Sequence, residues 1–273
     1  MGADEAGELA GGPVPILADT AVRRDDARRR RLRACASIVA GLAVWELVAR
    51  AVHNSLFVVP FTAVVARLAA MAANGQLWPH VATSAYEFGA GFLLATGSGI
   101  LIGVAMAASR RVEEYLDVWV WFLYATPLVA LMPFFIILFG VGLSAKVAIV
   151  YVMVVFPVLI NTFTGIRSAD ADLLEMIRSF GASRAQIFRE VLLPSALPFM
   201  LAGVRLGVGR GLIAVVVGEL FFGQRGLGYL INLAGQSFDT TLLFAGVLVF
   251  AVAGVTLNAL IRALERSLTP WRR

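Results

Sequence analysis

The chain has 273 residues, of which 59% are hydrophobic and 15% are charged, and its formal net charge is +5. Soluble proteins carry roughly 25% charged residues, so this composition and the mean hydropathy of +0.83 exclude an ordinary soluble domain and predict a polytopic membrane protein. The single cysteine, Cys35, excludes an internal disulfide and a cysteine cluster, and two isolated histidines, His53 and His80, predict no metal site.

Residues 1–33 are rich in Ala, Gly, Pro, Asp and Arg and have no apolar period, which predicts a disordered basic tail. The alternative is a cleaved signal peptide, because Ala49-Arg50-Ala51 has the small-x-small pattern of a cleavage site. The charged leader is too long for this, and the apolar stretch exceeds the usual h-region of about 7–15 residues. We therefore expect the tail to remain on the mature chain.

Six windows approach the length of about 20 apolar residues that a bilayer-spanning helix needs. They lie near residues 34–52, 88–108, 118–141, 147–166, 199–222 and 240–261. The first and the fifth contain charged residues, and the other four are free of charge. The predicted fold class is thus an all-α polytopic membrane protein with six transmembrane helices, and residues 34–273 are expected to form one transmembrane domain.

The segment 54–66, between the first two windows, is apolar but too short to span a bilayer, and Pro60 interrupts it. A re-entrant piece, an interfacial helix and a plain loop all remain open for it.

Lysine and arginine are unevenly distributed between the loops. If the N-terminus is cytoplasmic, the inner segments 1–33, 109–117, 167–198 and 262–273 hold 17 of the 23 basic residues. The outer segments contain only Arg67, Lys146 and Arg225. This bias follows the positive-inside rule and predicts that both termini are cytoplasmic. The positive charge then reports membrane sidedness, and we expect no nucleic-acid partner.

The inner segment 167–198 has the pattern of a short helical hairpin. Asp172 followed by Glu175, and Ser183 followed by Gln186, are two helix-start signatures. Gly181 lies between them, where a helix can end in a left-handed turn. Pro194 is expected to block continuation of the second helix, because proline lacks a backbone N–H.

The same segment has the spacing E-x5-G-x9-[IV]-x-L-P, formed by Glu175, Gly181, Val191, Leu193 and Pro194. This resembles the EAA loop of binding-protein-dependent ATP-binding cassette (ABC) importer permeases, whose short coupling helix inserts into a cleft of the ATPase. Met176 and Ile177 stand where the family has two alanines; both are apolar and compatible with a helix. The coupling residues that the resemblance implies are Asp172, Glu175, Met176, Ile177, Gly181, Ala182, Ser183 and Pro194.

Further segments are similar to the branch that imports nitrate, sulfonates and taurine. They are Trp45-Glu46-Leu47, Pro127-x5-Pro133, Phe139-Gly140-Val141-Gly142, Gly218-Glu219-Leu220, Gly226-Leu227-Gly228-Tyr229-Leu230-Ile231 and Pro270-Trp271-Arg272. The resemblance covers roughly residues 40–273. It implies a permease of the bacterial inner membrane that works as a homodimer with two ATPase subunits and an extracytoplasmic solute-binding protein, and that moves a small, anionic solute.

The chain contains no G-x4-G-K-[ST] phosphate loop, so we expect it to bind no ATP and no other cofactor itself. It also lacks the G-x-S-x-G and metal-spacing motifs of enzymes, and we expect no catalytic residue. Asn161, Thr164 and Glu219 are candidate pathway residues, with helix–helix hydrogen bonding as the alternative. An amino-acid or vitamin-precursor importer branch, or an ion-coupled secondary transporter, remains the rival function.

Overall fold

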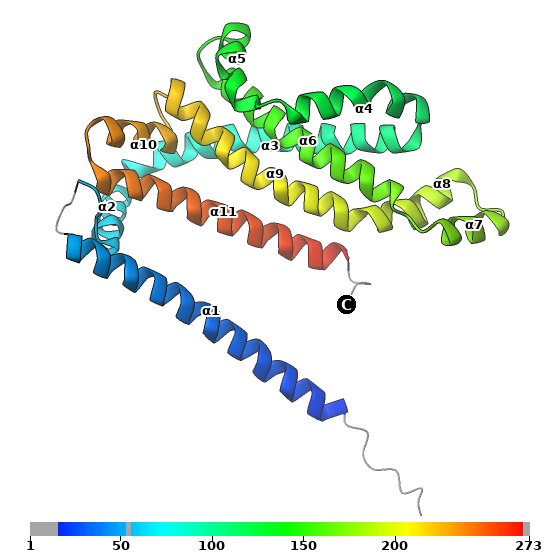
Figure 1. The fold of residues 1–273 in the computed structure, drawn as a ribbon, viewed down its shortest axis with the longest axis horizontal. Helices are drawn as coiled ribbons and strands as arrows, with labels where there is room; N and C mark the ends of the chain where they lie inside the picture. Colours follow the sequence, from blue (N-terminus) through cyan, green and yellow to red (C-terminus); the bar gives the residue numbers. More distant parts are fainter. Residues whose placement is uncertain (1–15, 53–55, 270–273) are drawn as a thin grey trace, which may run out of the picture. The chain divides into compact units, whose positions relative to one another are not determined.

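The computed structural model describes residues 16–52 and 56–269, and every regular element within them is helical (Figure 1). The chain divides into two compact units, residues 1–62 and 63–273. The all-helical fold class predicted from composition is confirmed. Pro270-Trp271-Arg272 and His53 lie outside the described residues.

The first unit is built on one long helix, α1 (Ile16–Val52), whose stretch Leu32–Val52 is apolar and long enough to cross a membrane. The predicted disordered tail is therefore wrong from Ile16 to Arg33, which are helical; residues 1–15 lie outside the description. Alanine, leucine and arginine are strong helix formers, and their abundance here outweighs the absence of an apolar period.

Several polar and aromatic contacts connect the end of α1 to the residues that follow it, up to Thr62. The Trp45 indole Nε1 donates to the carbonyl of Val59 at 3.0 Å, and its ring lies 5.4 Å from that of Phe61. Glu46 accepts from Arg50 at 2.6 Å and from the backbone N–H of Thr62 at 3.1 Å. The carboxylate of Glu46 therefore connects α1 with the start of the next helix at Thr62.

The second unit contains the remaining helices, except for the first two residues of α2, Phe61 and Thr62, which belong to the first unit. In chain order they are α2 (Phe61–Ala73), α3 (Leu77–Ala108), α4 (Arg110–Ala125), the 3-10 turn η1 (Leu128–Leu131), α5 (Met132–Phe139), α6 (Leu143–Arg167), α7 (Ala171–Ser179), α8 (Arg184–Ile187), the π-helical turn η2 (Phe188–Leu192), α9 (Leu193–Phe222), α10 (Leu227–Gln236) and α11 (Thr240–Leu268). In Figure 1, α7 and α8 lie at one end of this unit and α10 lies at the other.

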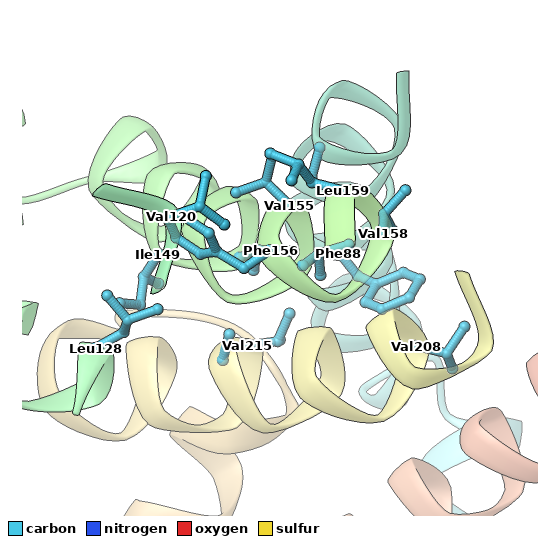
Figure 2. Packing of buried hydrophobic residues seen from close by; sticks show 14 of the residues in the cluster. Phe88, Val120, Leu128, Ile149, Val155, Phe156, Val158, Leu159, Val208 and Val215 are labelled. Atoms are coloured by element: carbon cyan, nitrogen blue, oxygen red, sulfur yellow. The ribbon is translucent and has the colours of Figure 1, made fainter. Parts of the chain in front are cut away.

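The centre of the second unit is α6, which packs against α3 on one side and α9 on the other. Its apolar residues Ile149 and Val158 are fully buried (Figure 2), and so are Val150 and Val154. Glycines allow this close approach, as small residues commonly do between membrane helices. A Cβ on Gly103 of α3 would lie 2.7 Å from the Leu159 carbonyl oxygen, and one on Gly203 of α9 would lie 2.8 Å from that of Pro157.

The third predicted span is not one straight helix. The α4 helix ends at Ala125, and the pair formed by α4 and the segment Leu128–Phe139 is bent by 87°. The break falls at Pro127, which cannot donate a helical hydrogen bond. Within the described residues, five helices are long and apolar enough to span a membrane, and the bent pair brings the number to six.

The segment 54–66 is resolved in part as helix, since α2 begins at Phe61. Val64 and Met71 of α2 are buried, and Met71 belongs to an apolar cluster with Leu227 and Leu242 of α10 and α11. The α2 helix is too short to span. A loop is therefore excluded for Phe61–Ala66, and the choice between an interfacial and a re-entrant piece stays open.

Candidate functional site

The hairpin between α6 and α9 has the predicted order of helix, turn and helix, but its first cap differs. The N-cap of α7 is Asp170, whose side chain accepts from the backbone N–H groups of Asp172 at 2.9 Å and Leu173 at 3.4 Å. Asp172, the predicted cap, lies in the first helical turn. There its negative charge interacts favourably with the positive end of the helix dipole. Glu175 is exposed one turn later.

The turn and the second cap follow the prediction. Gly181 has φ of +79°, and its N–H donates to the Arg178 carbonyl at 2.9 Å while the next N–H, of Ala182, reaches Ile177. This left-handed conformation is one that glycine adopts without steric cost. Ser183 and Gln186 then form a reciprocal capping box that starts α8.

Pro194 does not end the second helix, contrary to the prediction. The helical run continues from Arg184 to Phe222 through α8, η2 and α9. The π-helical turn at Phe188–Leu192 widens the backbone immediately before Pro194, which then occupies the first turn of α9. The change from π-helical to α-helical hydrogen bonding at this point accommodates the missing N–H of Pro194, so the helical run continues.

The α7 helix leaves its apolar side chains uncovered. None of its residues is buried, and Met176 is 50% exposed. Phe180, at the turn that follows, is 84% exposed. Leu173 is exposed as well, and Ile177 is half-buried. The hairpin thus presents an apolar helical face for which the described part of the chain provides no cover.

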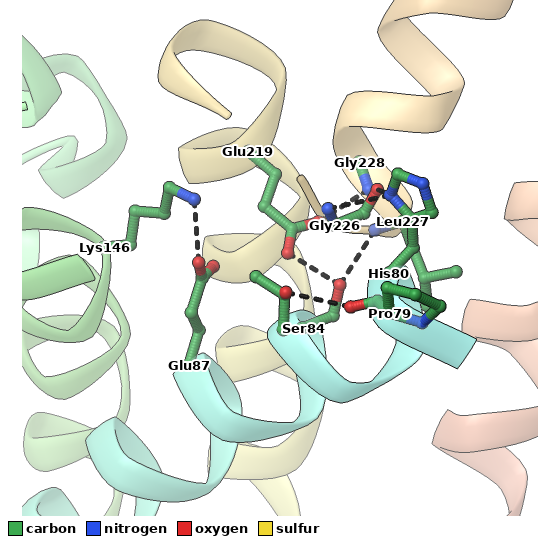
Figure 3. Close-up of polar contacts among 10 residues, drawn as sticks. Pro79, His80, Ser84, Glu87, Lys146, Glu219, Gly226, Leu227 and Gly228 are labelled. Carbon is green, nitrogen blue, oxygen red and sulfur yellow. Dashed lines mark hydrogen bonds and ion pairs between the residues drawn. The ribbon is translucent and has the colours of Figure 1, made fainter. Parts of the chain in front are cut away.

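A second group of polar residues lies at the opposite end of the second unit, around Glu219 of α9 (Figure 3). Glu219 is fully buried. Its Oε1 accepts from the hydroxyl of Ser84 in α3 at 2.6 Å, and its Oε2 accepts from the backbone N–H of Gly228 in α10 at 2.6 Å. Ser84 Oγ in turn accepts from Leu227 N at 2.9 Å. Glu219 therefore ties α3 and the start of α10 together.

The loop before α10 fits tightly over this carboxylate. Gly226 has φ of +124°, and a Cβ there would lie 2.1 Å from Glu219 Oε1. The N–H of Gly226 donates to His80 Nδ1 at 3.1 Å. His80 thus takes part in the hydrogen bonding of this loop.

Next to this network lies a buried ion pair between α6 and α3. Lys146 Nζ donates to Glu87 Oε1 at 2.7 Å, and the side chains are 8% and 1% exposed. The other oxygen, Glu87 Oε2, is buried and has no hydrogen-bond partner among the described residues. Such a group costs free energy unless something else donates to it.

The ion pair faces a cavity of about 280 Å³. The cavity is lined by Thr83, Glu87, Val141, Gly142, Leu143, Lys146, Phe222, Gln224 and Arg225. Gln224 and Arg225 are exposed residues of the loop between α9 and α10. Arg67, the third cation predicted for this side, lies 3.6 Å from the carboxylate of Asp239.

The three candidate pathway residues occupy different places. Glu219 lies in the buried network. Asn161 donates through Nδ2 to the Pro157 carbonyl at 2.8 Å and packs against Gly203, so it lies at the crossing of α6 and α9. Thr164 is exposed on α6. The structure brings none of them together, and their pathway role stays a prediction.

Other ionisable residues within the spans join helices. Arg205 of α9 pairs with Glu265 of α11. Arg210 of α9 donates to the Tyr124 hydroxyl at 2.9 Å and stacks over its ring at 4.7 Å. These contacts connect α9 with α11 and with α4.

Sequence reasoning missed Glu87 and Lys146 as partners, since they are far apart in the chain. The available signal was an acid and a lysine that each lie at the edge of an apolar window, a costly position for an unpaired charge.

The family match and the similar proteins all describe membrane components of transport systems. Residues 99–273 match the family described as binding-protein-dependent transport system inner membrane component. An aliphatic sulfonates transport permease protein of Bacillus subtilis is 35% identical over 266 residues, covering 96% of each chain. The taurine transport system permease protein of Escherichia coli is 34% identical, covering 84% of this chain and 86% of its own. A riboflavin transport system permease protein of Chloroflexus aurantiacus is 37% identical over 79% of this chain and 81% of its own.

Among solved structures, an inward-facing MetNI methionine ABC transporter chain is similar, with a TM-score of 0.61 and 18% identity. The match covers 71% of this chain and 98% of that one. An amino acid ABC transporter chain has a TM-score of 0.55 and 16% identity, covering 74% and 97%. At these identities the likeness concerns the fold.

Proposed function

The chain belongs to the family of binding-protein-dependent transport system inner membrane components, and on this premise we propose that it is the permease subunit of an ATP-driven importer for a small anionic solute of the sulfonate, taurine or nitrate kind. It is a membrane transport subunit and not an enzyme, as its full-length relatives are permease proteins. The family implies ATPase and solute-binding partners.

The exposed hairpin carries the proposal. The apolar side chains of Leu173, Met176 and Phe180 face away from the described fold, and Gly181 with the Ser183 capping box fixes the angle between α7 and α8. A rigid apolar helix at the end of a membrane bundle is suited to insertion into a groove of a partner. We assign this groove to the ATPase, which would supply the phosphate loop whose motif this sequence does not contain.

The coupling residues act in this proposal as one folded unit. Asp172 and Glu175 place negative charge in the first turns of α7, Met176 and Ile177 contribute apolar surface, and Gly181, Ala182 and Ser183 form the turn. Pro194 lies where η2 passes into α9. Closure of the ATPase dimer would move the hairpins and shift the spans between two states.

The solute class rests on the relatives, of which the two with the broadest coverage named above are described as sulfonate and taurine permeases. The test is uptake into proteoliposomes that contain the permease, its ATPase and its binding protein. We expect uptake of a radiolabelled alkanesulfonate or aminoalkanesulfonate that requires both ATP and the binding protein.

Two other results would contradict the proposal. Uptake driven by an ion gradient without ATP would identify a secondary transporter. Uptake of an amino acid or a vitamin precursor in place of sulfonates and nitrate would place the chain in a neighbouring importer branch, as its similarity to the riboflavin permease allows.

We further propose that two copies of this chain form the membrane part, because an alternating-access pathway of this type lies between two permease halves. Two copies that carry different affinity tags are expected to co-purify with the ATPase. Recovery of a second, different permease chain with each tagged copy would show a heterodimer instead.

A further inference from the structure

Two buried carboxyl groups face each other at the centre of the network in Figure 3. They belong to Glu87 of α3 and Glu219 of α9, which are both fully buried. The two carboxyl groups lie within hydrogen-bonding reach of each other. Two carboxylates this close repel each other strongly where water is excluded, so the contact is stable only if a proton lies between them.

The charges around this pair do not balance if both acids are ionised. Within the described residues, the cation bonded to the pair is Lys146, whose Nζ donates to Glu87 Oε1 at 2.7 Å. Two carboxylates and one ammonium would leave a net charge of about −1 buried among the helices, and a buried group in that position takes up a proton instead. One proton shared by Glu87 and Glu219 makes the cluster neutral.

The hydrogen bonds assign this proton to Glu87 Oε2. Both oxygens of Glu219 already accept a hydrogen bond, Oε1 from the Ser84 hydroxyl and Oε2 from the Gly228 N–H, each at 2.6 Å. The Ser84 oxygen itself accepts from Leu227 N–H, which fixes the direction of its hydroxyl. Of the four carboxyl oxygens, Glu87 Oε2 alone is buried without a donor in the described chain. An O–H group there turns an unsatisfied acceptor into a donor to Glu219.

We propose that Glu87 and Glu219 form a proton-binding site, in which the protonated carboxyl group of Glu87 donates from Oε2 to the carboxylate of Glu219. The bound proton joins α3 to α9 at the point where Glu219 also holds the start of α10. It therefore acts as a latch on this end of the second unit. The site does not depend on which solute is transported, so it stands or falls separately from the proposed function.

Glutamine at position 87 reproduces the proposed protonated state. Its side-chain oxygen can accept from Lys146 and its amide N–H can donate to Glu219, so each group keeps a partner. We expect the full-length Glu87→Gln permease, purified in detergent, to melt within about 2 °C of the wild type. An ordinary buried ion pair predicts a clear loss of stability, because the substitution would leave the ammonium of Lys146 without a negative partner. A Glu87→Gln chain that does not fold would therefore overturn the proposal.

Glu219→Gln is the contrasting variant. Glutamine presents one acceptor oxygen where Ser84 and Gly228 each donate to a separate oxygen, so one of the two donors loses its partner. We expect the melting temperature to fall by about 5 °C, as for an unsatisfied buried donor in a chain of this size. Equal melting temperatures of the two glutamine variants, or a larger loss in Glu87→Gln, would overturn the assignment of the proton to Glu87.

The pH dependence gives a readout that a purely structural contact would not change. A proton that the folded chain holds and the unfolded chain releases contributes less stability as the pH rises. From neutral to alkaline pH, the melting temperature of the wild type should fall by about 5 °C more than that of Glu87→Gln, which has no proton to lose. Lys146 is present in both proteins, so a fall caused by its own deprotonation would appear in both.

Two other charged or titratable groups face this end of the second unit within the described chain, His80 and Arg225. His80 must be neutral at Nδ1 to accept from Gly226 N–H, so its protonation weakens the fold toward acidic pH, the opposite direction. Arg225, which lines the neighbouring cavity, keeps its charge over the whole range. Neither group therefore produces the expected alkaline loss.

Glu265→Gln is the matched control for the pH experiment. It removes the acidic member of another ion pair between helices, the one with Arg205. Its melting temperature should show the same dependence on pH as that of the wild type. If Glu87→Gln also shows the wild-type dependence, the pair binds no proton and the proposal is wrong.

Discussion

At the scale of single residues, Gly181 determines the shape of the hairpin. Its φ of +79° is a conformation that residues with a Cβ adopt at a cost of about 1–2 kcal/mol. A Cβ at this position would meet no other atom within 4 Å. The cost of a substitution is therefore confined to the backbone, and this makes the position a clean probe of the turn.

We predict that Gly181→Ala lowers the ATP hydrolysis that solute-loaded binding protein stimulates, since relaxation of the turn would change the angle of α7. Gly75→Ala is the control, because Gly75 has φ of +80° and equally open space but lies in the turn before α3. Gly181→Asn should restore part of the stimulation, because asparagine tolerates the left-handed region. Equal ATPase stimulation in the two alanine variants would contradict a coupling role for the hairpin.

Residue signals predicted the turn well because they act locally. Gly181 and the pair Ser183 and Gln186 need only their neighbours to form a turn and a capping box. The first cap was less certain, since Asp170 and Asp172 both have side chains that can cap a helix. An N-cap residue has non-helical backbone angles. Asp170 has a ψ of 122°, which is not helical, so it is the cap.

At the scale of elements, the contact between α3 and α6 depends on which face each glycine of α3 occupies. Gly91, Gly99 and Gly103 meet atoms of α6, whereas Gly89 and Gly97 meet none within 4 Å. Glycine permits close helix packing at any of these five positions. The sequence could not distinguish the two faces, because both are apolar.

This difference predicts opposite effects of the same substitution. Gly103→Ala would place a Cβ 2.7 Å from the Leu159 carbonyl oxygen, and we expect it to destabilise the fold by about 1–3 kcal/mol. Gly97→Ala has open space and should stabilise α3 by up to about 1 kcal/mol through helix propensity. Thermal unfolding of both variants in the same detergent measures the difference; a melting temperature that moves in the same direction for both would refute this packing.

Two prolines show why element boundaries were harder to predict than the elements. Pro127 separates α4 from the next segment and bends the chain by 87°. Pro194, by contrast, lies within a continuous helical run, because η2 absorbs the missing hydrogen bond. Both prolines lack the N–H that a helix needs. The surrounding structure determines whether the helix then ends, as at Pro127, or continues after a π-helical turn, as at Pro194.

At the scale of the whole molecule, the distribution of basic residues predicts the orientation in the membrane. The hairpin end and the α10 end of the second unit should face the cytoplasm and the exterior, respectively. The single native cysteine makes this accessible to labelling, since Cys35→Ser leaves a chain without cysteine.

In that background we predict that Gln236→Cys, at the end of α10, reacts with a membrane-impermeant maleimide in intact spheroplasts. Phe180→Cys, at the hairpin turn, should react only after the membrane is permeabilised. Both side chains are exposed in the permease chain, so burial does not explain a difference when the permease is expressed without its ATPase. The reverse pattern would show that the orientation is inverted.

The pairing of distant charges could not be predicted at this scale. Glu87 and Lys146 are 59 positions apart, and Ser84 and Glu219 are 135 apart. Each lies near the end of an apolar window, and no local pattern specifies which window packs against which. Only the arrangement of α3, α6 and α9 brings them together.

The uninterrupted helical run from Arg184 to Phe222 has a mechanical consequence. It comprises 39 residues and extends from the hairpin to the loop beside the cavity, on the order of 60 Å away. In the proposed coupling mechanism, a push on α8 would be transmitted along this helical run to Glu219 and Phe222 without an intervening loop. The π-helical turn near the hairpin and Pro198 inside α9 are the points where this run can bend most easily, and their stiffness would set how much of a movement at the ATPase reaches the solute.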